Sequence, residues 1–192
     1  MQILSLSIPD VKVITPKIFR DERGFFSETF NAAGLAEHGF RETFLQDNHA
    51  MSRAAYVVRG LHFQIPPSAQ GKLVRVVKGA IFDVAVDIRH GSPTYGHYVS
   101  RELSARNWEQ LWVPVGFAHG YCTLEPDTEV IYKVTAPYDP SHEQGVQFDD
   151  PALNIDWPVN RERMQLSEKD KKSEPLSRHD VYFQYDAGGG IE

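Results

Sequence analysis

The stretch KLVRVVKGAIFDVAVDI, residues 72–88, decides the fold class. Apolar residues, most of them β-branched, dominate positions 72–78 and 81–88, and Gly79 lies between the two runs. Runs of this kind on either side of a turn residue are typical of β-strands. Side chains two positions apart share one face of a strand, so Lys72 is expected on the same face as Val74 and Val76.

Similar runs recur on both sides of this stretch, separated by glycine and proline. We expect further strands over residues 25–30, 56–64, 96–103 and 128–134, with breaks at 91–93 and 137–140. Many short strands with few helices favour an all-β sandwich or barrel of jelly-roll type over a βαβ nucleotide-binding fold.

Two helices are expected beside the strands. The first covers residues 32–38, with Asn31 as its N-cap and Gly39 just past its end. The second begins at Ser167, because Ser167-Glu168-Lys169-Asp170 has the composition of a helix start.

Length and charge limit the possible functions. The chain has 192 residues and a mass of 21.8 kDa, so we expect a single domain over residues 1–185 and a flexible tail over 186–192. The formal net charge is −6 and no five-residue window forms a basic block, so nucleic acid and membranes are not expected partners. An anionic ligand must therefore meet a local basic site.

The sequence carries few signals for export or membrane insertion. The N-terminus MQILSLSIPDVKV has neither a basic flank nor a long apolar run, and no stretch approaches the roughly 18 apolar residues of a membrane span. Cys122 is the single cysteine and cannot form an intrachain disulfide. We expect a soluble cytoplasmic protein.

Strand alternation gathers chemically active side chains on apolar faces. Within the strand expected over residues 56–64, His62 shares a face with Val58 and Gln64, while Arg59 takes the opposite face. Further along the chain, Tyr132 lines up with Val130 and Val134. If these valines face the interior, the histidine and the tyrosine do so as well.

Each of these residues also has a purely structural interpretation. His62 can be a hydrogen-bonded core residue, Lys72 can reach water from a strand end, and Tyr132 can bond a backbone carbonyl. An inward lysine is costly without a carboxylate or an anionic ligand beside it. Three such residues on apolar faces favour a functional site, whereas His119 in GFAHG, residues 116–120, is ambiguous.

A metal site is not expected. Cupin metal sites pair two histidines one residue apart with a nearby acidic ligand, but here Gln64 stands where the second histidine belongs. No Asp or Glu follows before Lys72, and His62 with His119 makes too few ligands. Cys122 has no neighbouring base, so nucleophilic catalysis is not indicated.

Several segments read together closely resemble the dTDP-4-dehydrorhamnose 3,5-epimerase family. The main ones are RGLHFQ at 59–64, AQGKLVRV at 69–76 and FDVAVDIR at 82–89; the others are DERGFF at 21–26, QDN at 46–48, LWVP at 111–114, GFAHG at 116–120 and LSEKD at 166–170. They run in family order from about Phe19 to Asp170. The resemblance implies a metal-free cupin jelly roll that acts as a homodimer on a dTDP-linked 4-keto-6-deoxy sugar.

The resemblance also implies roles for single residues. His62 matches the catalytic base, Asp170 the carboxylate that pairs with it, Tyr132 the proton donor and Lys72 the cation at the keto oxygen. The positions that hold the sugar or the diphosphate are Arg23, Glu28, Gln46, Asn48, Arg59, His119, Glu143 and Lys169, and Tyr138 matches the aromatic residue that stacks on thymine.

The implied reaction inverts C3 and C5 of dTDP-4-dehydro-6-deoxy-D-glucose and gives dTDP-4-dehydro-L-rhamnose. It needs a base on one face, an acid on the opposite face and no cofactor, since the ketone itself takes up the electrons. Two alternatives stay open: inversion of C3 alone or of C5 alone, and a cupin that binds a sugar nucleotide without catalysis.

The N-terminal segment is a candidate for contact between subunits. Sheets seldom leave a long apolar edge unpaired, so residues 3–13 are a candidate to pair with a neighbouring subunit. Phe19, Arg23 and Glu28 would then reach the partner's pocket. The alternative is that residues 3–13 pair within their own chain.

Overall fold

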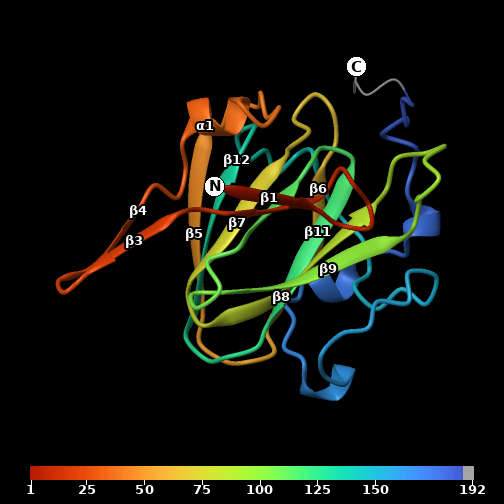
Figure 1. Ribbon diagram of the computed structural model, residues 1–192. Helices are drawn as coiled ribbons and strands as arrows, with labels where there is room; N and C mark the ends of the chain where they lie inside the picture. Colours follow the sequence, from red (N-terminus) through yellow and green to blue (C-terminus); the bar gives the residue numbers. More distant parts are fainter. Residues whose placement is uncertain (188–192) are drawn as a thin grey trace.

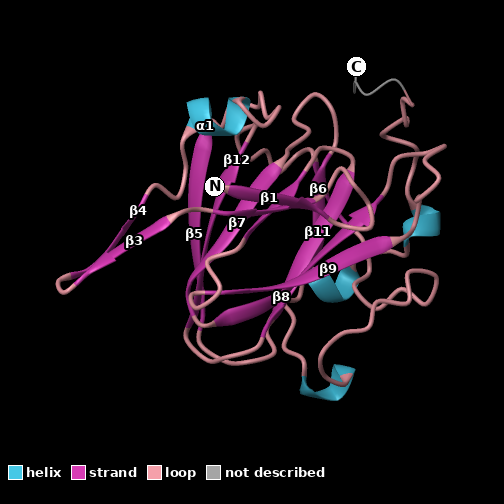
Figure 2. Cartoon of the chain, viewed as in Figure 1, coloured by secondary structure: helices cyan, strands magenta, loops and turns pink. Residues whose placement is uncertain are grey.

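A computed structural model describes residues 1–187, which form two antiparallel β-sheets packed face to face (Figure 1). Strands dominate and the helices are short (Figure 2). The elements are β1 Gln2–Ser5, β2 Lys12–Thr15, β3 Ile18–Asp21, β4 Gly24–Ser27, α1 Ala32–Ala36, β5 Gln46–Ser52, β6 Val58–Gln64, β7 Lys72–Lys78, β8 Ala80–Asp87, β9 Tyr98–Ser104, β10 Gln110–Val113, β11 Phe117–Thr123, β12 Thr128–Val134, β13 Glu143–Gly145 and the 3₁₀ turns Arg161–Arg163, Asp170–Lys172 and Leu176–Arg178. The expected flexible tail lies, from residue 188 on, outside the described residues.

Strand order shows how the sandwich is built. One sheet has six strands in the order β1-β2-β10-β7-β12-β5, and the other has five in the order β13-β6-β11-β8-β9. Strands β3 and β4 form a separate hairpin. The all-β jelly-roll sandwich is confirmed.

The main core lies between the two sheets. Valines of β7 and β12, among them Val74 and Val130, pack against Ile81 and Ala85 of β8 and Tyr121 of β11. Alternation also holds on these strands, because the inward residues recur at every second position. The sandwich interior therefore receives whatever polar side chains share these faces.

Other segments cover the outer faces of the sheets. Helix α1 brings Leu35 into a cluster with Leu73 and Trp112 on the outside of the six-stranded sheet. The C-terminal part of the chain packs residues such as Leu176 and Phe183 on the outside of the five-stranded sheet. Both faces of each central strand are thus apolar, which explains why strands β7 and β8 are so rich in valine.

The hairpin β3–β4 projects from the body of the sandwich (Figure 1). It carries three exposed aromatic rings, Phe19, Phe25 and Phe26, the last with 65% of its surface accessible. Rings on a projecting arm are not buried by their own chain, so the arm is a candidate interaction surface.

The expected elements agree with the observed ones to different degrees. Strands β7 and β12 have the predicted bounds, and α1 is capped by Asn31, whose Oδ1 accepts a hydrogen bond from the Gly34 backbone N–H at 3.0 Å. The second helix was predicted wrongly. The Ser167 Oγ accepts a hydrogen bond from the Asp170 backbone N–H and donates one to the Asp170 carboxylate, but the regular structure that follows is the three-residue 3₁₀ turn Asp170–Lys172.

The N-terminal segment pairs within its own chain. Strand β1 pairs with β2, and β2 pairs with β10, so residues 3–13 close onto the sandwich. Of the two arrangements considered for this segment, the intrachain one is present. No helix within residues 1–187 has the length and apolarity needed to cross a membrane.

Candidate active site

A cleft opens between the two sheets and consists of two adjoining chambers. The Tyr138 chamber has a volume of about 310 Å³ and the Asp170 chamber about 480 Å³. His62, Lys72 and Tyr132 line both chambers and so stand where they meet. Three residues that strand alternation placed on interior faces therefore share one cavity.

The three residues come from opposite walls of the cleft. His62 lies on β6 of the five-stranded sheet, whereas Lys72 on β7 and Tyr132 on β12 belong to the six-stranded sheet. The imidazole and the phenol therefore line the cavity from opposite walls.

His62 and Asp170 form a close pair. The imidazole Nε2 lies 2.6 Å from Oδ1 of Asp170, and the Ser167 hydroxyl donates to Oδ2 at 2.8 Å. Burial raises the pKa of Asp170, but these hydrogen bonds and the charge of His62 outweigh it and the pKa lies below its usual value. An ionised carboxylate on Nε2 fixes that nitrogen as the protonated one and leaves Nδ1 as the basic atom.

Lys72 is the cation of the cleft. Its Nζ donates a hydrogen bond to the His62 carbonyl oxygen at 3.3 Å, which ties the two walls together. Burial lowers the pKa of Lys72 to about 8, while the charges of Glu143 and Asp83 oppose this effect. The amine is therefore still largely protonated at neutral pH.

Tyr132 is half-buried beside Arg59. Burial raises the pKa of Tyr132, the Arg59 charge acts in the opposite direction, and the net pKa is raised. The phenol therefore carries its proton at neutral pH and can act as an acid.

The position of Arg59 corrects one expectation. Alternation placed Arg59 on the face opposite His62, but both residues line the Asp170 chamber. Strand β11 pairs His119 with His62 and Tyr121 with Arg59, so β6 uses three steps where β11 uses two. This β-bulge turns two residues three positions apart toward the same side.

Glycine makes the bulge possible. Gly60 has φ +107°, and a Cβ there would lie 2.6 Å from the His119 carbonyl oxygen. A side chain at this point would collide with the β11 backbone, and only glycine adopts this φ readily.

A second group of predicted residues lines the Tyr138 chamber. The Tyr138 hydroxyl donates to Glu143 at 2.7 Å, and Lys169 forms an ion pair with the same carboxylate. Gln46 donates from Nε2 to Asn48 at 2.8 Å. Glu143 has a lowered pKa: burial raises it, but the hydrogen bonds from Lys169 and Tyr138 outweigh burial.

Two predicted residues lie away from the cleft. Arg23 sits on the hairpin β3–β4 with 89% of its side chain exposed and pairs with Asp21 at 2.6 Å. Glu28 accepts a hydrogen bond from Asn31. Neither residue lines a chamber, so within one chain the structure does not join them to the other predicted site residues.

Sequence reasoning missed a second histidine–carboxylate pair. His119 lines the Asp170 chamber, and its Nε2 lies 2.6 Å from Oδ1 of Asp83 on β8. Asp83 is fully buried, and within residues 1–187 its Oδ2 has no hydrogen-bond partner. The alternation of β8, which turns Asp83 inward between Ile81 and Ala85, was the available signal.

Metal-ligating side chains do not gather in the described chain. Across residues 1–187, no group of three or more His, Cys, Asp or Glu side chains is arranged to hold a metal ion.

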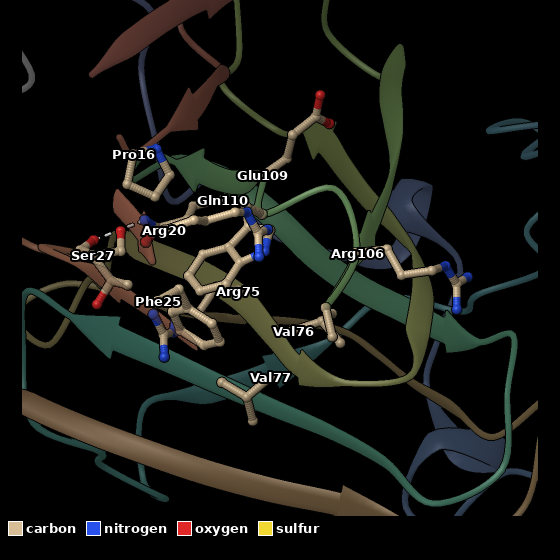
Figure 3. A pocket seen from close by; sticks show the side chains of 13 residues that line it. Pro16, Arg20, Phe25, Ser27, Arg75, Val76, Val77, Arg106, Glu109 and Gln110 are labelled. Carbon is tan, nitrogen blue, oxygen red and sulfur yellow. Dashed lines mark hydrogen bonds between the residues drawn. The ribbon is translucent and has the colours of Figure 1, made fainter. Parts of the chain in front are cut away.

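A further cavity lies elsewhere, at the base of the hairpin β3–β4 (Figure 3). It has a volume of about 640 Å³, and Arg20 and Phe25 of the hairpin face Arg75 of β7 and Trp108 across it. The Phe25 ring meets the Trp108 ring edge to face with centroids 4.7 Å apart. No predicted site residue lines this cavity, which lies between the hairpin and the sandwich.

Comparison with known proteins finds relatives that cover nearly the whole chain. A protein named dTDP-4-dehydrorhamnose 3,5-epimerase from Sinorhizobium fredii is 52% identical over 185 residues, covering 96% of this chain and 94% of its own length. The crystal structure of dTDP-6-deoxy-D-glucose-3,5-epimerase from Legionella pneumophila, in complex with dTDP-4-keto-L-rhamnose, superposes with a TM-score of 0.92 at 44% identity and covers 97% of this chain and 99% of that one.

A more distant structure shares the fold. It is a 3'-monoepimerase from Streptomyces bikiniensis in complex with dTDP-quinovose, with a TM-score of 0.83 at 30% identity, covering 90% of this chain and 87% of that one. The family description that matches residues 5–178 is dTDP-4-dehydrorhamnose 3,5-epimerase. With this match and these relatives, the chain belongs to the dTDP-4-dehydrorhamnose 3,5-epimerase family.

Proposed function

We propose that this protein inverts C3 and C5 of dTDP-4-dehydro-6-deoxy-D-glucose and releases dTDP-4-dehydro-L-rhamnose. One observation carries the proposal: a candidate base and a candidate acid, His62 and Tyr132, stand on opposite sheets and line the same cavity. Inversion at a carbon requires removal of a proton from one face and its return to the other.

His62 is the base that removes the proton. Its Nδ1 takes the proton from the carbon next to the ketone, and Asp170 stabilises the imidazolium that results through the bond to Nε2. The electron pair of the broken C–H bond moves into the ketone and forms an enolate. The substrate itself is the electron acceptor in this step.

Lys72 stabilises the negative charge that forms on the enolate oxygen. Its ammonium group stands in the partly buried junction of the two chambers, where a fixed charge acts more strongly than in water. Stabilisation of this type contributes roughly 10²–10³ in rate.

Tyr132 is the acid that returns a proton. The phenol gives its proton to the opposite face of the same carbon, after which the imidazolium loses its proton and the phenolate regains one through solvent. Repetition at the second carbon completes the double inversion. The raised pKa of Tyr132 suits this role, because the phenol stays protonated until the enolate forms.

The diphosphate needs local positive charge in a chain of net charge −6. Arg59 and Lys169 both line the Asp170 chamber and supply it. Guanidinium groups suit phosphate oxygens because they donate two parallel hydrogen bonds.

The proposed assembly is a homodimer. The hairpin β3–β4 exposes Phe19, Phe25 and Phe26, and the cavity in Figure 3 lies between its base and the sandwich. Docking on a second copy would cover these rings and bring Arg23 to the cleft of that copy. Such an arrangement would give Arg23 a role that it cannot have within its own chain.

Proton NMR in D₂O with dTDP-4-dehydro-6-deoxy-D-glucose tests the function. We expect deuterium at both C3 and C5. Exchange at a single carbon would instead assign the activity of a single-centre epimerase, as in the Streptomyces bikiniensis relative. Tight binding of the substrate without any exchange would favour a cupin that only binds sugar nucleotides.

A further inference from the structure

Three glutamine side chains meet one short backbone segment beside the cleft. The segment is residues 136–139, which follows β12 and carries Tyr138 at the mouth of the Tyr138 chamber. It belongs to no strand or helix, so its backbone groups find no partners in a sheet ladder.

The glutamines bond four consecutive residues of this segment. Gln70 donates from Nε2 to the Ala136 carbonyl at 2.6 Å, and Gln64 donates to the Pro137 carbonyl at 3.1 Å. Gln46 accepts from the Tyr138 backbone N–H at 3.0 Å, and Gln64 accepts from the Asp139 N–H at 2.9 Å. We infer that Gln46, Gln64 and Gln70 form a glutamine cradle, which positions Tyr138 for binding of the nucleotide; this inference rests on the proposed function.

The cradle is anchored in both sheets. Gln46 opens β5 of the six-stranded sheet, Gln64 closes β6 of the five-stranded sheet, and Gln70 lies just before β7. Gln64 is only 4% exposed, and its Nε2 also donates to the Ser68 carbonyl at 2.6 Å. Rigid strands thus hold a segment that has no regular structure of its own.

Tyr138 depends on this support. Its ring is largely exposed, and its hydroxyl bonds Glu143, so no core packing fixes the residue. The distance between the ring and a base stacked on it is therefore set by the backbone at residue 138. A shift of this backbone therefore changes how closely the ring can approach the base.

A direct ligand role fits Gln64 least well of the three. Both N–H groups of its amide are used, on the Ser68 and Pro137 carbonyls, and its oxygen accepts from Asp139. Gln64 therefore acts through the segment it holds and uses the position of a cupin metal ligand for this purpose. Gln46 bonds Tyr138 and Asn48 and keeps one N–H group for a ligand.

The test replaces the amides with an uncharged side chain of similar length. The variants are Gln70→Met and Gln64→Met, and the matched control is Gln184→Met, an exposed glutamine that lines neither chamber. Three quantities are measured: the Kd for dTDP, kcat and KM in the epimerase assay, and hydrogen–deuterium exchange of residues 136–142. Thermal unfolding shows that each variant is folded.

We expect the Kd for dTDP and the KM to rise about tenfold in Gln64→Met and about threefold in Gln70→Met, with kcat changed less than about twofold, as lost hydrogen bonds of ordinary strength imply. Amides of residues 136–142 should exchange faster, while those of strand β8 stay unchanged. The control should match the wild type in all assays.

Two results would overturn the cradle. One is wild-type dTDP affinity in a folded Gln70→Met or Gln64→Met protein. The other is unchanged exchange at residues 136–142. The exchange measurement needs no catalysis, so it tests the cradle even if the wild-type protein proves inactive as an epimerase. Failure of the cradle inference can therefore be told apart from failure of the proposed function.

Discussion

The imidazole of His62 lies 2.6 Å from the carboxylate of Asp170, although 108 positions separate the two residues in the chain. The contact exists because the C-terminal segment folds back over β6. Backbone bridges join Gln165 to Val57 and Glu174 to Val146 on either side of Asp170. The orientation of the candidate base thus depends on residues 165–174, which lie near the C-terminal end of the chain.

Replacement of His62 by alanine should abolish solvent exchange at the sugar carbons. Loss of a general base lowers the rate by roughly 10²–10⁴. The measurement is proton NMR of the substrate in D₂O, with the exposed His97→Ala as the matched control. Near-normal exchange in the His62→Ala protein would remove this residue from the mechanism.

Tyr132→Phe should separate the two halves of the reaction. His62 can still remove the proton and form the enolate, whereas return of a proton to the opposite face is lost. Deuterium should therefore enter the recovered substrate with little inverted product. Epimerisation at the wild-type rate would mean that another group supplies the proton.

Activity should decline as the pH rises through about 8, because the Lys72 amine has a pKa of about 8 and loses its charge there. Burial lowers this pKa from 10.5, so between about pH 8 and pH 10.5 the unfolded chain binds the proton that the folded protein has released. The contribution of Lys72 to the free energy of unfolding therefore rises with pH in that window.

Lys72→Met checks both consequences. The variant should lose the alkaline decline in kcat/KM along with most of its activity, and its Tm at neutral pH should rise because a buried charge is gone. An unchanged alkaline decline in the residual activity would assign that titration to a different group.

Removal of metal should leave the rate unchanged, since the proposed mechanism uses only side chains and the substrate ketone. The protein is dialysed against EDTA and assayed with and without added Zn²⁺, Mn²⁺ or Fe²⁺. Activity lost on dialysis and regained with one of these ions would revive a metal-dependent mechanism.

The homodimer should show a mass of twice 21.8 kDa in light scattering at micromolar concentration. Mixing His62→Ala chains with Arg23→Ala chains then tests whether Arg23 serves the opposite subunit, because a mixed dimer would regain one intact site. Mixed dimers that form and stay inactive would rule out the shared site.

Prediction from sequence succeeded where alternation and turn residues act together. Strand β7 shows both, and its inward residues, Lys72 included, lie as expected. The short strand β10 carries no such pattern, because its residues Gln110–Val113 are all buried. The helix expected from Ser167 stops after a single turn. Ser167 caps that turn as Asn31 caps α1, but the backbone becomes extended at Ser173, shortly before Pro175.

Strand alternation predicted some residues of the candidate site but none of the contacts between them. His62, Lys72 and Tyr132 follow from alternation, and Asp170 came from the family resemblance alone. The cradle role of Gln46 depends on a loop whose path no local pattern encodes. The partnership of His119 with Asp83 likewise depends on which strands become neighbours.

The extra residue in β6 has a consequence for protein engineering. Arg59 and His62 face one ligand only because the chain takes an additional step at Gly60. Deleting that one residue would restore the ordinary alternation and turn the arginine out of the cleft, although every functional side chain would still be present. To transfer this chemistry to another jelly roll, the extra residue in the strand must be inserted together with the functional side chains.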